Sequence, residues 1–251
     1  MTTQVQGLPK WRQGITPDLP TYKETTAPPS RPFWWMNRAH RGEPGFFLTA
    51  YLEDEQLFKP WEQAQVFKGE THWKAVGVRF APVCWRVRPF EWRDGKDGRK
   101  MRHFLKEWPK DRTAADPKFQ GYTEVIGFIA GDPDQRVWRM TGDGMIGIRY
   151  GVILDQYRDG LLSWARRTHA ENVPTWAFYL PITVDKDVNG QTIFTETGFG
   201  STVQLPMLAF PKKANAELAD LLYVGDDILH RGYTVRDEHD DWLNRWQEEA
   251  E

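Results

Sequence analysis

The spacing of apolar residues along the chain predicts many short strands and one long helix. Eight segments alternate in polarity or are rich in β-branched and aromatic residues, as strands are: 46–52, 73–80, 83–92, 124–130, 136–140, 176–184, 191–197 and 202–208. Between 146 and 169, apolar side chains recur close to every 3.6 residues, which predicts a helix that ends before Pro174. Helical patterns also cover 213–230 and 237–251. We therefore expect a mainly β fold with helices, of the α+β class.

The position of the long helix narrows the choice of fold. A Greek-key barrel of the OB type carries a helix between its third and fourth strands, and its open face binds oligonucleotides. In this fold 73–80, 83–92 and one or both of 124–130 and 136–140 would be the strands before the helix, and 176–184 and 191–197 would follow it. We expect an OB-like barrel with one long helix between strands and further helices at the C-terminus. The chain is predicted to have one strand more than the simplest version of this fold, so the order in which the strands pair stays open.

Composition divides the chain into three parts. Residues 1–32 contain six prolines and little apolar periodicity, so they are expected to form an extended or disordered arm. Residues 33–212 carry the predicted strands and include a polar, basic segment at 95–120 that is expected to be a loop. Residues 213–251 form a helical segment with an acidic tail.

Bulk properties point to a protein that works inside the cell. Hydrophobic residues make up 40% of the chain, enough for a core, yet no apolar run approaches the ~18 residues that a membrane span needs. The first residues lack the charged and then apolar layout of a signal peptide, so a cytoplasmic protein without membrane contact is expected. The single cysteine, Cys84, excludes an internal disulfide and a cysteine-based zinc module.

The net charge of −2 hides a strong asymmetry along the chain. Residues 72–118 hold 13 Lys and Arg against 6 Asp and Glu, a net charge of +7. Residues 214–251 hold 3 Arg against 11 Asp and Glu, a net charge of −8. A basic middle attracts phosphate, while an acidic end can compete for the same surface or bind a partner. The alternative is two solvated faces of opposite sign.

Aromatic and cationic side chains alternate between residues 84 and 104. If 85–92 is extended, two arginines share one face of the strand with Phe90 and Trp92. Cations can contact phosphates and flat rings can stack on unpaired bases, which is the chemistry of single-stranded nucleic-acid binding. In the alternative interpretation Phe90 and Trp92 belong to the core. The candidate contacts are Arg86, Arg88, Phe90, Trp92, Arg93, Lys96, Arg99, Lys100, Arg102 and Phe104, joined by Trp138 and Arg139 if their strands pair.

Other chemistry is less well supported by the sequence. Residues 142–147 match the G-x-G-x-x-G pattern of a dinucleotide site. The preceding strand is charged, however, and no acidic residue ends a following strand about 20 residues on, so a turn into the helix is favoured. Asp132 and Asp134 are typical of a turn. His230 lies nine residues before His239 and Asp240, a spacing that does not favour a metal site, so neither metal nor cofactor is expected.

The last fifteen residues, Asp237-Glu-His-Asp-Asp-Trp-Leu-Asn-Arg-Trp-Gln-Glu-Glu-Ala-Glu251, complete a layout that resembles a known family. Bacterial and phage single-stranded-DNA-binding proteins combine an OB-type core with an acidic C-terminal tail that recruits replication partners. The resemblance covers about 70–210 by layout and 237–251 by charge. It implies a non-enzymatic protein of phage or plasmid DNA replication or recombination. The implied ligand is single-stranded DNA, with RNA as the alternative ligand. Oligomers would be compatible with this role.

Two other functions are compatible with the sequence. The aromatic residues could form the core and interfaces of a structural or protein-interaction component, for example of a virion. Alternatively, the loop from Gly142 to Gly147 could serve a nucleotide-binding enzyme.

Overall fold

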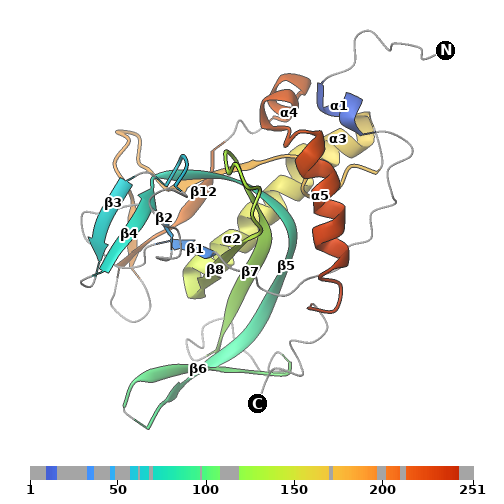
Figure 1. Cartoon of the computed structure of the whole chain (residues 1–251). Coiled ribbons are helices and arrows are strands. Elements are labelled where there is room, and N and C mark those ends of the chain that lie inside the picture. The colour runs from blue at the N-terminus through green and yellow to red at the C-terminus, as the bar shows by residue number, and fades with distance from the viewer. Residues whose placement is uncertain are drawn as a thin grey trace, which may run out of the picture.

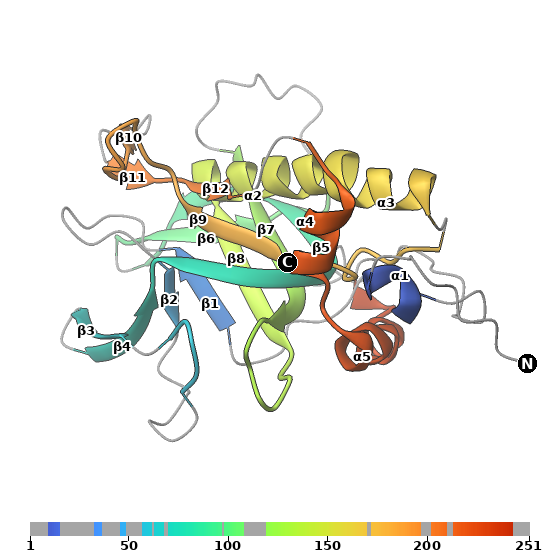
Figure 2. The same ribbon diagram turned by 90° about the horizontal axis from the view of Figure 1, so that it is seen from above.

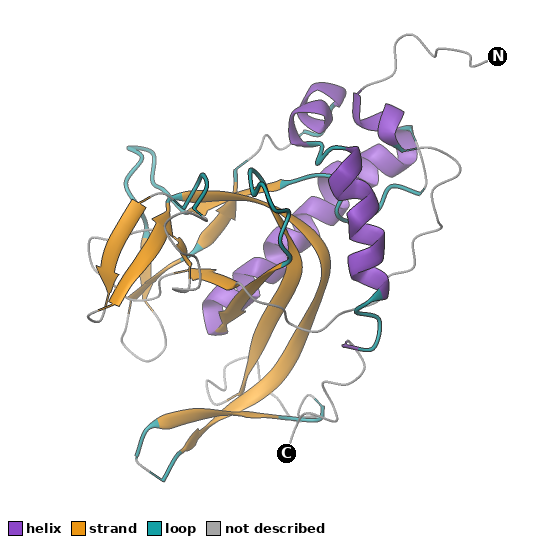
Figure 3. Cartoon of the chain, viewed as in Figure 1, coloured by secondary structure: helices purple, strands orange, loops and turns teal. Residues whose placement is uncertain are grey.

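Ten of the twelve described strands form one large sheet, and helices lie on both of its faces (Figures 1 and 3). The computed structural model describes residues 10–15, 33–36, 46–48, 57–61, 63–67, 70–96, 98–107, 119–169, 172–196, 202–209 and 213–242. The strands are β1 Phe33–Met36, β2 Phe46–Leu48, β3 Gln63–Phe67, β4 Glu70–Ala75, β5 Gly77–Asp94, β6 Lys100–Phe104, β7 Phe119–Ile129, β8 Trp138–Asp143, β9 Leu180–Val184, β10 Phe194–Glu196, β11 Thr202–Gln204 and β12 Pro206–Leu208. The helices are α1 Lys10–Gly14, α2 Gly144–Tyr157, the π-helical turn η2 Arg158–Leu162, α3 Ser163–Thr168, α4 Ala216–Leu222 and α5 Asp226–Asp237.

Six strands form an antiparallel unit around β5. The order β12-β9-β5-β7-β8 is antiparallel throughout, and β6 pairs with the far end of β5. On its outer side β8 pairs with β1 in parallel, and the sheet continues through β2, β4 and β3. The small sheet of β10 and β11 stands apart. Within the described part of the chain the sheet stays open, because β1 occupies the edge of β8 that barrel closure would require.

The strand β5 is longer than the sequence predicts. Two strands, 73–80 and 83–92, were expected, but 77–94 is one strand of 18 residues. Pro82 does not end it, because the register with β7 shifts between Pro82 and Cys84, and a bulge accommodates a residue that has no N–H to donate. The expected loop at 95–120 contains β6, which returns along β5 as a hairpin. Residues 108–118 lie outside the described residues.

The long helix is confirmed, as is the α+β class. The segments α2, η2 and α3 run consecutively from Gly144 to Thr168, close to the predicted 146–169. Its buried side is apolar, with Tyr150, Ile153 and Tyr157 in the core. Figure 2 shows α2 and α3 along one face of the sheet and α5 on the other side. None of the described helices is long and apolar enough to cross a membrane.

Two predictions about the second half of the chain are wrong in detail. The segment around 191–197 turns back after Gly190 as expected, yet β10 pairs with β11 and not with the strand at 180–184. The helix expected at 213–230 is divided into α4 and α5. Gly225 separates them with a φ of 86°, a conformation that favours glycine.

The predicted N-terminal arm lies outside the described residues except for 10–15. There the short helix α1 buries the ring of Trp11 completely, against Trp164, His169 and Phe178. The backbone N–H of Trp11 also donates to the Asp220 carboxylate of α4 at 3.2 Å. At least this part of the arm is therefore held on the body of the protein.

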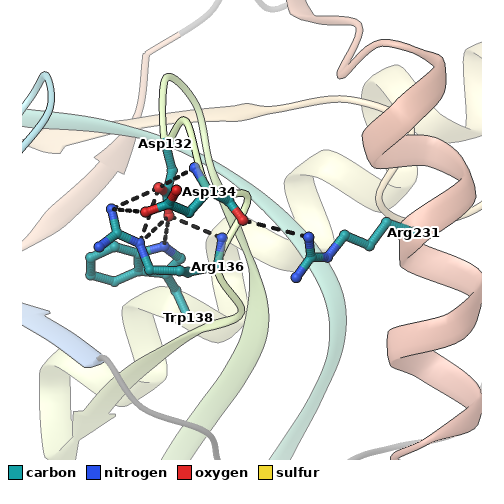
Figure 4. Close-up of polar contacts among 5 residues, drawn as sticks. All are labelled: Asp132, Asp134, Arg136, Trp138 and Arg231. Atoms are coloured by element: carbon teal, nitrogen blue, oxygen red, sulfur yellow. Dashed lines mark hydrogen bonds and ion pairs between the residues drawn. The ribbon is translucent and has the colours of Figure 1, made fainter. Parts of the chain in front are cut away.

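The loop between β7 and β8 is organised by one buried carboxylate (Figure 4). Asp132 accepts hydrogen bonds from the backbone N–H groups of Asp134 and Arg136, from the Arg136 guanidinium and from the Trp138 indole N–H at 2.8 Å. Arg231 of α5 donates to the Asp134 carbonyl at 3.5 Å. The predicted turn role of Asp132 and Asp134 is thus confirmed. Among the described residues no group of three His, Cys, Asp or Glu is placed to hold a metal ion.

Candidate nucleic-acid interface

One face of the central strands is lined with arginines and aromatic rings. The opposite face is occupied by α2, since the Thr123 hydroxyl of β7 donates to the Gly147 carbonyl of α2 at 3.0 Å. Side chains alternate along a strand, so Tyr122 and Glu124 point away from α2. They lie opposite Arg88 and Arg86 of β5 in the sheet register. We call the surface formed by Arg86, Arg88, Trp92, Arg102, Phe104, Tyr122 and Arg139 the arginine–aromatic face.

Cations and rings alternate along this face. The Arg88 guanidinium carbon lies 3.8 Å from the centre of the Phe104 ring. The guanidinium of Arg102 lies 5.0 Å from the ring of Tyr122 and 5.6 Å from the ring of Trp92. These distances are within the range of cation–π attraction. Burial lowers the pKa of Arg102 from its ordinary value, and an ion pair with Asp143 of β8 holds its guanidinium in place.

A single carboxylate connects the arginines at the centre of the face. The Glu124 side chain is only 1% exposed and contacts Arg86 at 2.8 Å, Arg88 at 3.0 Å and Arg139 at 3.4 Å. Burial of a charge is costly unless the charge is paired and hydrogen-bonded, and the three arginines supply that pairing for the Glu124 carboxylate. The contacts also fix the positions of three arginines that come from two different strands.

The hairpin of β5 and β6 extends this face into solvent. Figure 1 shows the hairpin reaching beyond the rest of the sheet. Lys96, Arg99 and Lys100 are exposed at its tip, and Arg93 is exposed nearby on β5. Lys100 forms an ion pair with Asp94 at 2.7 Å, and Arg93 forms one with Glu91. The Lys100–Asp94 pair is exposed on both sides and contributes little to stability, so the cations at the tip remain suited to meeting a polyanion.

The sequence-predicted contacts divide into three groups by burial. Four of them, Arg93, Lys96, Arg99 and Lys100, are exposed around the hairpin. Five lie at least partly accessible on the arginine–aromatic face: Arg88, Trp92, Arg102, Phe104 and Arg139. Three are buried: Arg86, Phe90 and Trp138.

The buried group corrects the predicted set of contacts. The rings of Phe90 and Trp138 are 0% exposed, so neither offers a surface on which a base could stack. Phe90 packs against Trp92 and Phe104 and supports the face from below. Trp138 belongs to the separate cluster around Asp132, with Phe58 and Trp61. Arg86 is committed to Glu124 and to the C-terminal segment.

The start of the predicted acidic tail lies on this face. Trp242, which is 2% exposed, stacks on the Arg86 guanidinium at 3.7 Å, and its carbonyl accepts a hydrogen bond from Arg86 Nη1 at 2.8 Å. A segment 156 residues away in sequence therefore covers the innermost arginine of the face. Residues 243–251 lie outside the described residues.

Four participants were missed from sequence: Tyr122, Glu124, Asp143 and Trp242. The predicted strand began at Glu124, whereas β7 begins at Phe119, so the period-2 pattern that would have placed Tyr122 opposite Arg88 was cut short. Asp143 lies between two glycines of the G-x-G-x-x-G pattern, and that pattern predicts a backbone role for this segment and gives no indication of a side-chain role for Asp143. Nothing in the local sequence indicates that Trp242 meets Arg86.

Comparison with protein-family models, curated proteins and solved structures finds no match to this chain.

Proposed function

We propose that the protein binds single-stranded nucleic acid, DNA in the first place, through the arginine–aromatic face and the β5–β6 hairpin. The observation that carries this proposal is the alternation of guanidinium groups and rings along β5, β6 and β7 beside a protruding basic hairpin. Guanidinium groups bind phosphates and stack on bases, and exposed rings stack on any base regardless of sequence. Together they favour a ligand whose bases are unpaired.

The order of the strands supports the same function. When β6, β10 and β11 are set aside, the strands β5, β7, β8, β9 and β12 pair in the order of an OB-type Greek key, with the long helix between the third and the fourth. In OB folds the second and third strands and the loop between the first two strands bind oligonucleotides. The corresponding elements here are β7, β8 and the basic hairpin. They carry Tyr122, Arg139 and the hairpin residues of the arginine–aromatic face, while Arg86 and Arg88 lie beside them on β5. In a closed OB barrel the last strand would pair with β8. Here the N-terminal strand β1 pairs with that edge of β8 instead.

The proposed biological role is non-enzymatic coating, protection or annealing of single strands during replication or recombination. Its support is the sequence resemblance together with the acidic C-terminus. In this proposal residues 237–251 recruit replication or recombination proteins, since an acidic segment that leaves the face when DNA binds becomes available to a partner.

Charge reversal at the hairpin tip tests the proposal with little risk to folding. Lys96→Glu combined with Arg99→Glu changes two exposed side chains, so thermal stability should stay near that of the wild type. Affinity for a fluorescent oligo(dT) should fall at least about tenfold, and the salt dependence of binding should become weaker, because fewer phosphates are neutralised.

The matched control is Lys10→Glu combined with Arg167→Glu, which reverses two exposed charges on α1 and α3. This variant changes the net charge by the same amount as the hairpin variant. Its affinity for oligo(dT) should stay within about twofold of the wild type at the same salt concentration. Equal losses in both double variants would indicate attraction to overall charge and contradict the assignment of the face. Absence of binding by the wild type would favour a structural or interaction role.

A further inference from the structure

Glu124 holds a central position that the proposed binding chemistry does not by itself require. The carboxylate sits on β7 between the two strands that supply its partners, and it is almost completely buried. The Nε atoms of Arg86 and Arg88 contact the same oxygen, Oε2, at 2.8 and 3.0 Å, while Nη1 of Arg139 contacts Oε1 at 3.4 Å. One anion thus fixes three cations.

This arrangement decides how the arginines meet their aromatic neighbours. Long arginine side chains carry considerable rotamer entropy, and a guanidinium stacks on a ring only when its plane is held there. Arg88 lies over Phe104 at 3.8 Å while its Nε contacts Glu124, so the carboxylate anchors the stacked geometry. The same carboxylate reduces the positive potential that a phosphate would meet on this face.

We propose that Glu124 is a positioning residue of the nucleic-acid interface, which orients the arginines for stacking at the cost of electrostatic attraction. The inference rests on the proposed function. Loss of the Glu124 charge should therefore affect the two components of binding in opposite directions: the stacking component becomes weaker and the salt-dependent component becomes stronger.

The test is Glu124→Gln, with oligo(dT) affinity measured at about 50 mM and about 500 mM salt. For single strands, each additional phosphate contact changes the slope of log K against log salt by about −0.7, or about fivefold across this tenfold range. The variant should bind about fivefold more weakly than the wild type at the higher salt and nearly equally at the lower salt. A merely structural defect would lower affinity at both concentrations and reduce the slope.

Two further variants keep the inference decidable. Asp185→Asn is the matched control, because Asp185 is a partly buried carboxylate that pairs with Arg149 of α2 at 3.3 Å, away from the arginine–aromatic face. It should keep the wild-type slope. Glu124→Asp keeps the charge but withdraws it by one methylene, so it should keep the slope and lose affinity at both salt concentrations.

The outcomes separate this inference from the proposed function. An unchanged Glu124→Gln variant, or one weakened equally at both salt concentrations, would overturn the positioning role while leaving nucleic-acid binding intact. If Glu124→Gln does not fold, wild-type affinity of Glu124→Asp at both concentrations would overturn it in the same way. If the wild type shows no salt-sensitive binding, the proposed function fails first and this inference fails with it.

Discussion

At the scale of single residues, Asp132 shows how one carboxylate can fix a hairpin. Its side chain is fully buried, which alone would raise its pKa. Hydrogen bonds from the Arg136 guanidinium, the Trp138 indole and the Asp134 backbone N–H outweigh the burial and hold the pKa of Asp132 below its ordinary value. The folded state therefore stabilises the ionised form, and the loop depends on that charge.

We expect Asp132→Asn to lower the free energy of unfolding at neutral pH by about 2–3 kcal/mol, because the Arg136 cation loses its charged partner. A lowered pKa in the folded state means that this contribution is present above the ordinary pKa of 3.8 and is lost as the pH falls through the folded value. Urea unfolding of wild type and variant should therefore differ by a constant amount from neutrality to about pH 5, and converge in the acid range below about pH 4. A difference that grows on acidification would contradict this role of Asp132.

At the scale of elements, the junction of β8 and α2 explains the glycine pattern at 142–147. A Cβ on Gly142 would lie 2.7 Å from the Tyr150 ring, and a Cβ on Gly147 would lie 2.7 Å from the Gly142 carbonyl oxygen. Gly144 has a φ of 52°. Close packing and a positive φ thus account for all three glycines, in agreement with the interpretation as a turn into the helix.

We expect Gly147→Ala to destabilise the protein by about 2 kcal/mol or more, since the contact atoms are backbone and cannot move aside easily. Gly151→Ala on the same helix is the matched control, because a Cβ there meets no atom within 4 Å. It should gain up to about 1 kcal/mol from helix propensity. Thermal unfolding of the two variants measures both values, and equal effects in the two would refute the steric explanation.

The C-terminal segment is the second element with a testable role. The acidic charge of 237–251 suggests deleting this whole segment to test whether it competes with DNA. Trp242 is buried on Arg86, however, so the truncated variant should end at Trp242. Residues 243–251 contain one Arg and three Glu. Their removal should tighten binding of oligo(dT) severalfold at low salt and have little effect at high salt, where screening is strong.

Glu248, Glu249 and Glu251 replaced together by Gln provide a variant of the same length. It should tighten binding as much as the truncation does if charge is the cause. Fluorescence anisotropy at two salt concentrations measures both variants. Unchanged or weaker affinity of these variants for oligo(dT) at low salt would contradict competition between the tail and DNA for the arginine–aromatic face.

At the scale of the whole molecule, local patterns predicted the elements better than their partners. The periodicity of 146–169 predicted the long helix, because an apolar stripe that repeats every 3.6 residues matches one side of a helix and cannot match a face of a strand. The alternation around Arg86 correctly placed two arginines on one face with Phe90 and Trp92. The same alternation could not show which face is covered, since this depends on Glu124 and Trp242, which lie 38 and 156 residues away from Arg86.

The proposed function requires that single-stranded DNA is bound by stacking and by phosphate contacts together. Titration of the wild type with oligo(dT), followed by intrinsic tryptophan fluorescence at about 50 mM and about 500 mM salt, tests it most directly. We predict saturable quenching, with an affinity at least about tenfold weaker at the higher salt and little quenching by duplex DNA of the same length. Quenching that is absent, or that is equal for duplex and single strand and insensitive to salt, would contradict the proposed function.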